Sequence, residues 1–363
     1  MKEIRTIIEG YNNIDFATTK AALVTVVGLK GSSYRRRGAR MLVLDNGIYL
    51  GGISGGCLEG DALKRAQIAI LKDRPSIVTY DTTKGDDVQI GIGLGCNGII
   101  DILFTPLKAN DNNNPVKILS SIINTRTPQL LTTITGGTSS LLGNNFLYDG
   151  AADLENVLAN KSLSSLSSQI SNDINICFDT LTSSTITYAK EDLEITLFLE
   201  IILPETNLVV YGNNNDITSI AKIAKELGWK VTIVCNLIKA SKLMYQTADK
   251  LLEMKDHSLS FVDDHTAVVL MTHDFQTDKI HLPQILKTSA SYIGLLGPKT
   301  RAERLFNELE ISMEDRVFAP TGLDIGATTP EEIALSIIAE IKSKFAKREA
   351  GYLKNRNTPI NEN

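Results

Sequence analysis

Two cysteines stand in glycine-rich stretches whose composition suits thiol chemistry. Five glycines lie between Gly51 and Gly60 around Cys57, and Cys96 follows 39 positions later (96 − 57) in the similar stretch 91–98. Glycine loses more conformational entropy on folding than any other residue, so a cluster of glycines indicates backbone that turns sharply or approaches another group closely. Both stretches therefore predict exposed backbone N–H groups beside a reactive thiol.

The segments on either side of Cys57 predict a hairpin that leads into it and a helix that follows it. Residues 41–44 and 48–50 are apolar runs joined by an Asn-Gly turn. From Glu59 to Leu71, apolar residues recur with the spacing of an amphipathic helix. Cys57 is then expected at a helix N-terminus, where unpaired N–H groups and the helix dipole favour an anion or a thiolate. The residues predicted to contact a ligand in the two thiol loops are Ser54, Gly55, Gly56, Cys57, Glu59, Gly95 and Cys96.

A buried structural cysteine is the alternative interpretation of Cys57. We favour a functional thiol, because a cysteine that only packs does not need glycines on both sides. Before Gly38, the residues Ser32, Ser33 and Arg35 have the composition of an anion-binding turn, for which a solvated basic loop is the alternative. Ser32 and Arg35 are therefore added to the candidate ligand-binding residues.

From Asn207 onward, predicted strands and helices alternate, which is typical of a doubly wound parallel sheet. Ligands of such sheets bind beyond the carboxyl ends of the strands. A histidine in a loop at that edge can act as a base or a hydrogen-bond donor, or it can cap the next helix. Basic residues at the start of a helix suit phosphate. The candidate ligand-binding residues at this edge are Gly212, Asn214, His273, Asp274, Lys299, Arg301 and Asp324.

The segment Gly212–Asp216 occupies the position of the glycine loop in a dinucleotide-binding fold, but it lacks the second and third glycines. Cys235 stands where an acidic residue would bind the ribose. Two interpretations stay open, a working NAD(P) site and a fold that keeps the loop without the ligand. The side-chain amides of residues 213–215 could still hold a polar ligand.

Composition excludes several classes of protein. With 43% hydrophobic and 22% charged residues over 363 positions, the chain has the composition of a globular protein large enough for two or three domains. The net charge of -5 argues against binding to nucleic acid, and no run reaches the roughly 18 apolar residues of a membrane span. Four cysteines without a close pair indicate reduced thiols, so we expect a cytoplasmic location. The spacing of the cysteines and histidines predicts no metal site.

The chain is expected to divide into two domains and a short tail. Residues 1–204 form the first domain, 205–348 the second, and 349–363 a polar tail. Within the first domain, the strand pattern of residues 1–108 starts again in residues 116–204, without the two thiol loops. We interpret this pattern as an internal duplication in which the second copy lacks both loops.

Six ordered motifs along nearly the whole chain resemble those of a known family. They are GSSYRRRGARML (31–42), GGISGGCLEGD (51–61), GLGCNG (93–98), MTHD (271–274), YIGLLGPKTRAERL (292–305) and PTGLDIGATTPEEIALSIIAEI (320–341). Together they resemble the XdhC/CoxI family, the xanthine dehydrogenase accessory proteins. The resemblance implies an α/β chain, with a mixed α+β XdhC/CoxI-type domain followed by a Rossmann-like domain.

The resemblance also implies an accessory protein rather than an enzyme with turnover of its own. Proteins of this family bind molybdenum cofactor (molybdopterin), protect its sulfurated form with help from a cysteine desulfurase, and deliver it to a xanthine dehydrogenase-like molybdenum hydroxylase. The phosphate of molybdopterin suits an amide-rich loop and its molybdenum–sulfur centre suits a thiolate, so Cys57 is expected to be the main contact.

Two other functions stay open on the sequence alone. One is an NAD(P)-dependent oxidoreductase that uses the Rossmann-like domain, and the other is a persulfide sulfur carrier that uses Cys57 or Cys96. No nucleic acid or membrane is expected among the partners, and a homodimer is left open as the oligomeric state.

Overall fold

The computed structural model of the chain describes five ranges of residues. They are 1–31, 33–81, 98–161, 163–191 and 193–358. The chain forms two compact units, an N-terminal unit of Glu3–Pro204 and a C-terminal unit of Glu205–Asn355. None of the helices in the described ranges combines the length and the apolar character needed to cross a membrane.

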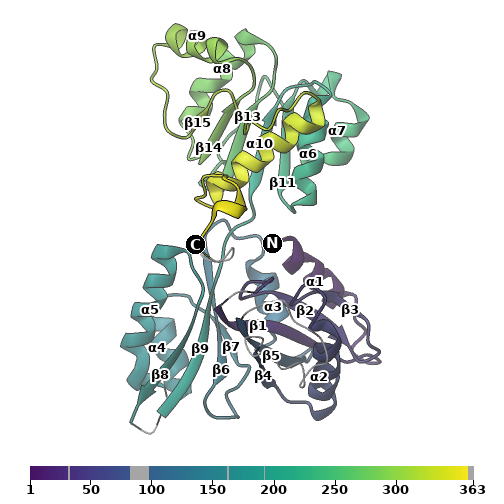
Figure 1. Ribbon diagram of the computed structural model, residues 1–363, viewed down its shortest axis with the longest axis vertical. Coiled ribbons are helices and arrows are strands. Elements are labelled where there is room, and N and C mark those ends of the chain that lie inside the picture. Colours follow the sequence, from purple (N-terminus) through teal and green to yellow (C-terminus); the bar gives the residue numbers. More distant parts are fainter. Residues whose placement is uncertain (32, 82–97, 162, 192, 359–363) are drawn as a thin grey trace. The chain divides into compact units, whose positions relative to one another are not determined.

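The first half of the N-terminal unit is an antiparallel sheet with helices packed against it (Figure 1). The strands are β1 Ala21–Gly31, β2 Arg40–Leu44, β3 Tyr49–Gly51, β4 Ser76–Asp81 and β5 Gly98–Leu107, in the spatial order β3-β2-β1-β5-β4, and the helices are α1 Lys2–Asn12 and α2 Glu59–Lys72. Successive residues of a strand point to opposite faces. Val24 of β1 lies in the apolar cluster that contains Ala66 of α2, whereas Leu23 lies in the cluster that contains Ile7 of α1. Both faces of β1 are covered, which explains its continuous apolar run.

The second half of the N-terminal unit is another antiparallel sheet, with the spatial order β7-β6-β9-β8. Its elements are α3 Pro115–Ile122, β6 Gln129–Gly136, β7 Asn145–Leu147, α4 Ala151–Asn160, the 3₁₀ helix Ser164–Leu166, α5 Ser167–Thr180, β8 Ser184–Lys190 and β9 Leu193–Ile202. This order repeats β2-β1-β5-β4 of the first sheet. The strand pairing also shifts at corresponding points, between Val26 and Gly28 in β1 and between Ile134 and Gly136 in β6. The shared order and shift support the proposal of an internal duplication.

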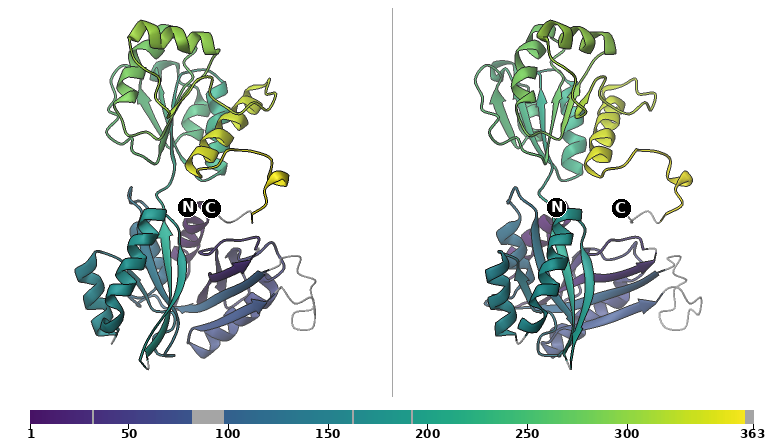
Figure 2. Two further views of the ribbon diagram at one scale, coloured as in Figure 1. Left: turned by 60° about the vertical axis from the view of Figure 1, so that its left-hand side comes forward. Right: turned by 90° about the vertical axis from the view of Figure 1, so that its left-hand side faces the viewer.

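The two sheets of the N-terminal unit pack against each other, and helices α2, α4 and α5 lie on the outer faces (Figure 2). Val27 of β1, Leu103 of β5 and Phe198 of β9 form a small buried cluster between the sheets. Arg40 of β2 and Glu200 of β9 also meet there, and their side chains are only 3% and 7% exposed. A buried charged pair therefore joins one half to the other.

The C-terminal unit is a parallel six-stranded sheet with helices on both faces (Figure 1). The strands are β10 Asn207–Tyr211, β11 Lys230–Cys235, β12 Lys250–Glu253, β13 Thr266–Leu270, β14 Tyr292–Leu295 and β15 Val317–Phe318. The helices are α6 Asp216–Glu226, α7 Lys242–Thr247, α8 Phe275–Leu286, α9 Lys299–Leu309 and α10 Pro330–Phe345, with short 3₁₀ helices at Leu237–Lys239 and Leu353–Asn355.

The spatial order of this sheet, β12-β11-β10-β13-β14-β15, is that of Rossmann folds. It confirms the predicted doubly wound sheet. The direction of winding reverses between β10 and β13, so the loops that follow these two strands lie at the point where such folds bind their ligands. Gly212 begins the first of these loops, and Thr272 and His273 lie in the second.

Candidate functional site

The Cys57 loop, which we define as residues 52–58, joins strand β3 to helix α2. Gly51 precedes it with a φ of +80°, and a Cβ at this position would lie 2.4 Å from the carbonyl oxygen of Arg40. The hairpin therefore needs glycine at this position to deliver the chain to the loop. Cys57 lies directly before Leu58, the N-cap of α2, as the sequence predicts.

Glu59, the first residue of α2, folds back onto the Cys57 loop. Its Oε1 accepts hydrogen bonds from the backbone N–H groups of Ile53 (3.2 Å) and Ser54 (2.8 Å), and its Oε2 accepts one from the Ser54 hydroxyl. The Ser54 oxygen in turn accepts from the N–H groups of Gly56 (3.2 Å) and Leu58 (3.0 Å). We call this arrangement the Ser54–Glu59 clamp.

The clamp keeps the Glu59 carboxyl group ionised. Burial raises its pKa, but the hydrogen bonds from Ser54 and Ile53 outweigh burial, and the net shift of the pKa is downward. A charged carboxylate that accepts several N–H groups fixes the loop more firmly than a neutral acceptor would.

The clamp leaves two backbone N–H groups of the loop without a partner among the described residues, those of Gly55 and Cys57. Gly55 and Gly56 are exposed, and the side chain of Cys57 is half-buried against the apolar cluster under α2. The loop thus presents unpaired amide donors next to a free thiol. Such a surface can accept an anion and a thiophilic centre together.

Cys57 differs from the other described cysteines, because Cys177 and Cys235 are buried. Burial raises the pKa of Cys177, and it raises that of Cys235 to about 11. A buried thiol with a raised pKa is a poor nucleophile and a poor ligand. Cys96 and Gly95 of the second thiol loop lie outside the described residues, so their predicted roles stay predictions.

Arg35 contacts a carboxylate of the chain itself. Its guanidinium pairs with Glu3 of α1, and the other oxygen of Glu3 accepts the backbone N–H of Arg40 (3.0 Å). The side chain of Arg35 thus ties its loop to α1. Ser32, predicted beside it, lies outside the described residues.

The loop after β10 is closed by its own side chains. Gly212 has a φ of +142°, and a Cβ there would lie 2.5 Å from the carbonyl oxygen of Met271, so glycine is needed at this position. Asn213 exchanges two hydrogen bonds with the backbone of Asn236 (3.0 and 2.8 Å), and Asn214 donates to the Met271 carbonyl at 3.4 Å. The amides of Asn213 and Asn214 therefore hold this loop to the ends of β11 and β13.

His273 contacts an acidic side chain at the point where the winding of the C-terminal sheet reverses. Its Nε2 lies 2.8 Å from Oδ2 of Asp216, which belongs to the first turn of α6. His273 also has a left-handed backbone with a φ of +55°, which is uncommon for a residue other than glycine. The cap of the next helix is Asp274 and not His273, because the Asp274 carboxylate accepts from the N–H of Thr277 at 2.7 Å.

Asp216 stands where a Rossmann fold holds the diphosphate of a dinucleotide, at the N-terminus of the helix after the first strand. Its carboxylate carries the same sign of charge as a phosphate and already interacts with the helix dipole. The first turn of α6 is therefore poorly suited to a diphosphate.

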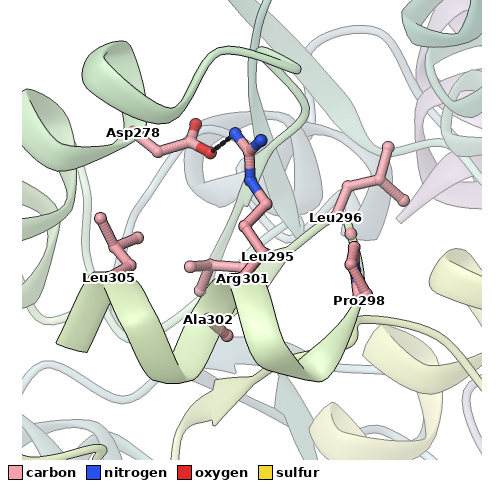
Figure 3. Close-up of a pocket in the computed structure, with 8 residues that line it drawn as sticks. Asp278, Leu295, Leu296, Pro298, Arg301, Ala302 and Leu305 are labelled. Atoms are coloured by element: carbon pink, nitrogen blue, oxygen red, sulfur yellow. Dashed lines mark hydrogen bonds and ion pairs between the residues drawn. The ribbon is translucent and has the colours of Figure 1, made fainter. Parts of the chain in front are cut away.

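Asp278 and Arg301 line a pocket between α8 and α9 (Figure 3). The Arg301 guanidinium donates to Oδ2 of Asp278 (2.6 Å), and the Thr272 hydroxyl donates to Oδ1 (2.5 Å). Arg301 thus binds a carboxylate of the chain itself, as Arg35 does. Lys299 is 76% exposed with Glu303 at 3.9 Å, and Asp324 is exposed.

Sequence reasoning missed Asp216 and Asp278, the acidic partners of His273 and Arg301. Each pair joins residues distant in sequence, so no local pattern reveals it. An acidic residue directly after an incomplete glycine motif was nevertheless a usable signal for Asp216. Nothing in the sequence around Asp278 indicates its role.

Two family models match the chain. Residues 17–81 match the model described as the XdhC and CoxI family, and residues 208–341 match the model described as the XdhC Rossmann domain. The first match contains the Cys57 loop. The second contains nearly the whole C-terminal sheet.

Two known proteins are similar to this chain over most of their length. One, from Bacillus subtilis (strain 168), is described as a probable subunit of xanthine dehydrogenase and is 29% identical over 330 residues, which are 89% of this chain and 92% of that protein. The other is the molybdenum cofactor insertion chaperone PaoD of Escherichia coli (strain K12), 25% identical over 328 residues, which are 89% of this chain and 83% of that protein.

A solved structure shares the fold of nearly the whole chain. It is the crystal structure of a xanthine dehydrogenase from Bacillus halodurans at 2.80 Å resolution, with a TM-score of 0.72 and 26% identity. The similarity covers 95% of this chain and 97% of that one.

Proposed function

This chain belongs to the XdhC and CoxI family, and from this premise we propose that it is an accessory protein that binds molybdenum cofactor and inserts it into a xanthine dehydrogenase-like molybdoenzyme. The two similar proteins bear names of this kind, one for insertion of molybdenum cofactor and the other for a component of xanthine dehydrogenase. The cofactor is cargo in this proposal, and the client enzyme and a cysteine desulfurase are the proposed partners.

The Cys57 loop is the observation that carries the proposal. Molybdenum cofactor combines a phosphate with a sulfur-bound metal, and the loop combines unpaired N–H groups at Gly55 and Cys57 with a free, half-buried thiol. Backbone N–H groups near a helix N-terminus bind phosphate, and a thiolate is a soft ligand that suits a molybdenum–sulfur centre. The N–H donors of the loop thus suit the negative phosphate of the cargo, and the thiol suits its metal–sulfur centre.

The Ser54–Glu59 clamp prepares the loop for this task. Glu59 and Ser54 accept hydrogen bonds from four backbone N–H groups of the loop, those of Ile53, Ser54, Gly56 and Leu58. These N–H groups therefore have hydrogen-bond partners even when no cargo is bound. The loop can therefore hold its shape before the cargo arrives and after it leaves. A chaperone that must release its cargo benefits from such preorganisation, because little ordering free energy is spent at each binding event.

The C-terminal candidates Gly212, Asn214, His273 and Asp274 remain proposed ligand contacts at the carboxyl edge of the sheet. Lys299 and Asp324 remain proposals of the same kind, because both are exposed at the carboxyl edge of the sheet. Arg301 and Arg35 are proposed as positioning residues, since each guanidinium is held by a carboxylate.

Retention of the cofactor tests the proposed function. The protein is purified from cells that make molybdenum cofactor, and bound pterin is measured by its fluorescence after oxidation. We expect pterin on the wild-type chain and little on Cys57→Ala. Cys177→Ala is the matched control, because it removes a buried thiol from the other half of the same unit. No pterin on the wild type, or equal pterin on Cys57→Ala, contradicts the proposal.

A persulfide carrier is a second candidate, favoured by the accessibility of the Cys57 thiol. The Cys57 thiolate would take the terminal sulfur of a persulfide on the desulfurase, and the desulfurase thiolate would leave. Intact-mass spectrometry after incubation with a loaded desulfurase decides this. One added sulfur atom on the wild type, absent from Cys57→Ala, supports the carrier, and no added sulfur removes it.

A further inference from the structure

An exposed aromatic ring lies against the Cys57 loop. Tyr34, in the segment between β1 and β2, is 70% exposed, and within the described part of the chain its hydroxyl has no hydrogen-bond partner. A Cβ at Gly55 would lie 3.3 Å from Cγ and 3.4 Å from Cδ1 of Tyr34. The Tyr34 ring is therefore in contact with the backbone of Gly55, two positions before Cys57.

Gly55 lets the Tyr34 ring lie close to the backbone of the loop. Any larger residue would bring its Cβ to a tight distance from the ring and displace Tyr34 by a few tenths of an ångström. Most of the ring is open to solvent, and the N–H groups of Gly55 and Cys57 in the loop that it touches have no partner among the described residues. The Cys57 loop thus carries two unpaired amide donors and a thiol, and an exposed aromatic ring touches the same loop at Gly55.

We propose that Tyr34 is the stacking surface for the planar heterocycle of the cargo. The inference rests on the proposed function, because it names the part of the cargo that this residue recognises. A planar heterocycle stacks on an aromatic side chain without needing a specific hydrogen-bond pattern, which suits an exposed ring whose hydroxyl has no partner among the described residues. The thiol and the amide donors would then contact the other chemical groups of the same molecule.

This division of roles separates two kinds of residue. Tyr34 binds the ring system, which is present with or without the metal and the phosphate. Cys57 binds the metal–sulfur end. A free pterin, which has only the ring system, is therefore a probe for Tyr34 alone.

The test measures free pterin binding by fluorescence anisotropy on the full chain, beside the retention of the complete cofactor. Tyr34→Ala should weaken pterin binding by roughly tenfold, which is the scale of stacking on one aromatic ring. Tyr34→Phe should bind like the wild type, because the ring and not the hydroxyl makes the contact. Cys57→Ala should bind free pterin normally while it loses the complete cofactor.

Tyr245→Ala is the matched control, since Tyr245 is a similarly exposed tyrosine on α7 of the C-terminal unit. Equal pterin binding by Tyr34→Ala and the wild type, or an equal loss in Tyr34→Phe, overturns the role of Tyr34. Normal retention of the complete cofactor by Cys57→Ala overturns the proposed function instead. A wild-type chain that binds neither probe overturns both.

Discussion

The two halves of the N-terminal unit share a framework and differ in one loop. The order β2-β1-β5-β4 is repeated as β7-β6-β9-β8, and both sheets shift their pairing at a glycine of the corresponding strand. In the first half, residues 52–58 separate β3 from α2, and in the second half only residues 148–150 separate β7 from α4. The second sheet folds without a glycine loop, a clamp or an accessible thiol at the corresponding described positions. These features of the first half therefore serve something other than closing the sheet.

The largest expected effect on stability comes from the buried pair of Arg40 and Glu200, which joins the two halves. Arg40→Ala should destabilise the chain by about 3–5 kcal/mol, because it leaves the buried carboxylate of Glu200 without its partner. Urea unfolding at neutral pH measures this. Arg35→Ala, which breaks a partly exposed pair with Glu3 in the same unit, should cost only about 1 kcal/mol. Equal losses in the two variants would show that the halves do not depend on the buried pair.

Removing the clamp is the next largest change, and it should affect one half only. Glu59→Gln should cost about 1–3 kcal/mol of stability, because the ionised acceptor of three hydrogen bonds is lost, and it should reduce cofactor retention. Asp153→Asn in the first turn of α4 is the counterpart in the second half, where no side chain caps the helix. It should cost less than about 1 kcal/mol and leave retention unchanged.

The pH dependence of the clamp follows from its pKa. The pKa of Glu59 is lower in the folded chain than in the unfolded chain, so its stabilisation is complete above the unfolded value of about 4.3 and is lost as the pH falls through the folded value. The difference in stability between the wild type and Glu59→Gln should accordingly shrink below about pH 4. A difference that grows on acidification would contradict this assignment.

The helix N-terminus of α6 extends the comparison to the C-terminal unit. The Cys57 loop has unpaired amides, whereas the loop at α6 is closed by Asn213 and Asn214 and carries the carboxylate of Asp216. Calorimetry with NAD(H) and NADP(H) should show no binding tighter than about 1 mM. Asp216→Ala combined with Asn214→Gly should improve binding by roughly tenfold, by removing like charge and the closing amide. Tight binding by the wild type would restore an NAD(P) function.

The smallest expected effect concerns His281 of α8, which is buried beside His257 and Tyr211. Burial and then the charge of His257 lower the pKa of His281, although Asp278 opposes them. The unfolded chain therefore binds more protons below about pH 6.5, and the C-terminal unit should lose stability as the pH falls from there. Trp229, the single tryptophan, reports unfolding of this unit by fluorescence. The dependence should weaken in His281→Gln, and a rise in stability on acidification would refute it.

Local patterns predicted much of the fold. The apolar runs on either side of the Asn-Gly turn are β2 and β3, and the amphipathic run from Glu59 is α2. The capping box of Thr329 and Glu332 at the start of the last helix is a signal of the same local kind. These signals depend on residues close in sequence, and so they can be recognised in a single chain.

Elements without a local signal were missed. The strands β15 (Val317–Phe318) and β12 (Lys250–Glu253) are too short to show the alternation of apolar and polar residues that marks a strand. Helix α5 is rich in Ser, Asn and Asp, which are not typical of a helix interior. The sequence located the Cys57 loop because glycine and cysteine are conspicuous there. It did not show that Glu59 accepts the N–H groups of the loop, nor that Tyr34 touches Gly55, because both depend on how the loop folds.

Hydrogen exchange on the cofactor-loaded and cofactor-free chain tests the central claim most directly. If the Cys57 loop holds the cargo, the amides of residues 52–60 should exchange more slowly when the cofactor is bound, whereas residues 148–153 of the other half should exchange at the same rate in both states. Protection that is equal in the two halves, or confined to the C-terminal unit, would contradict the account.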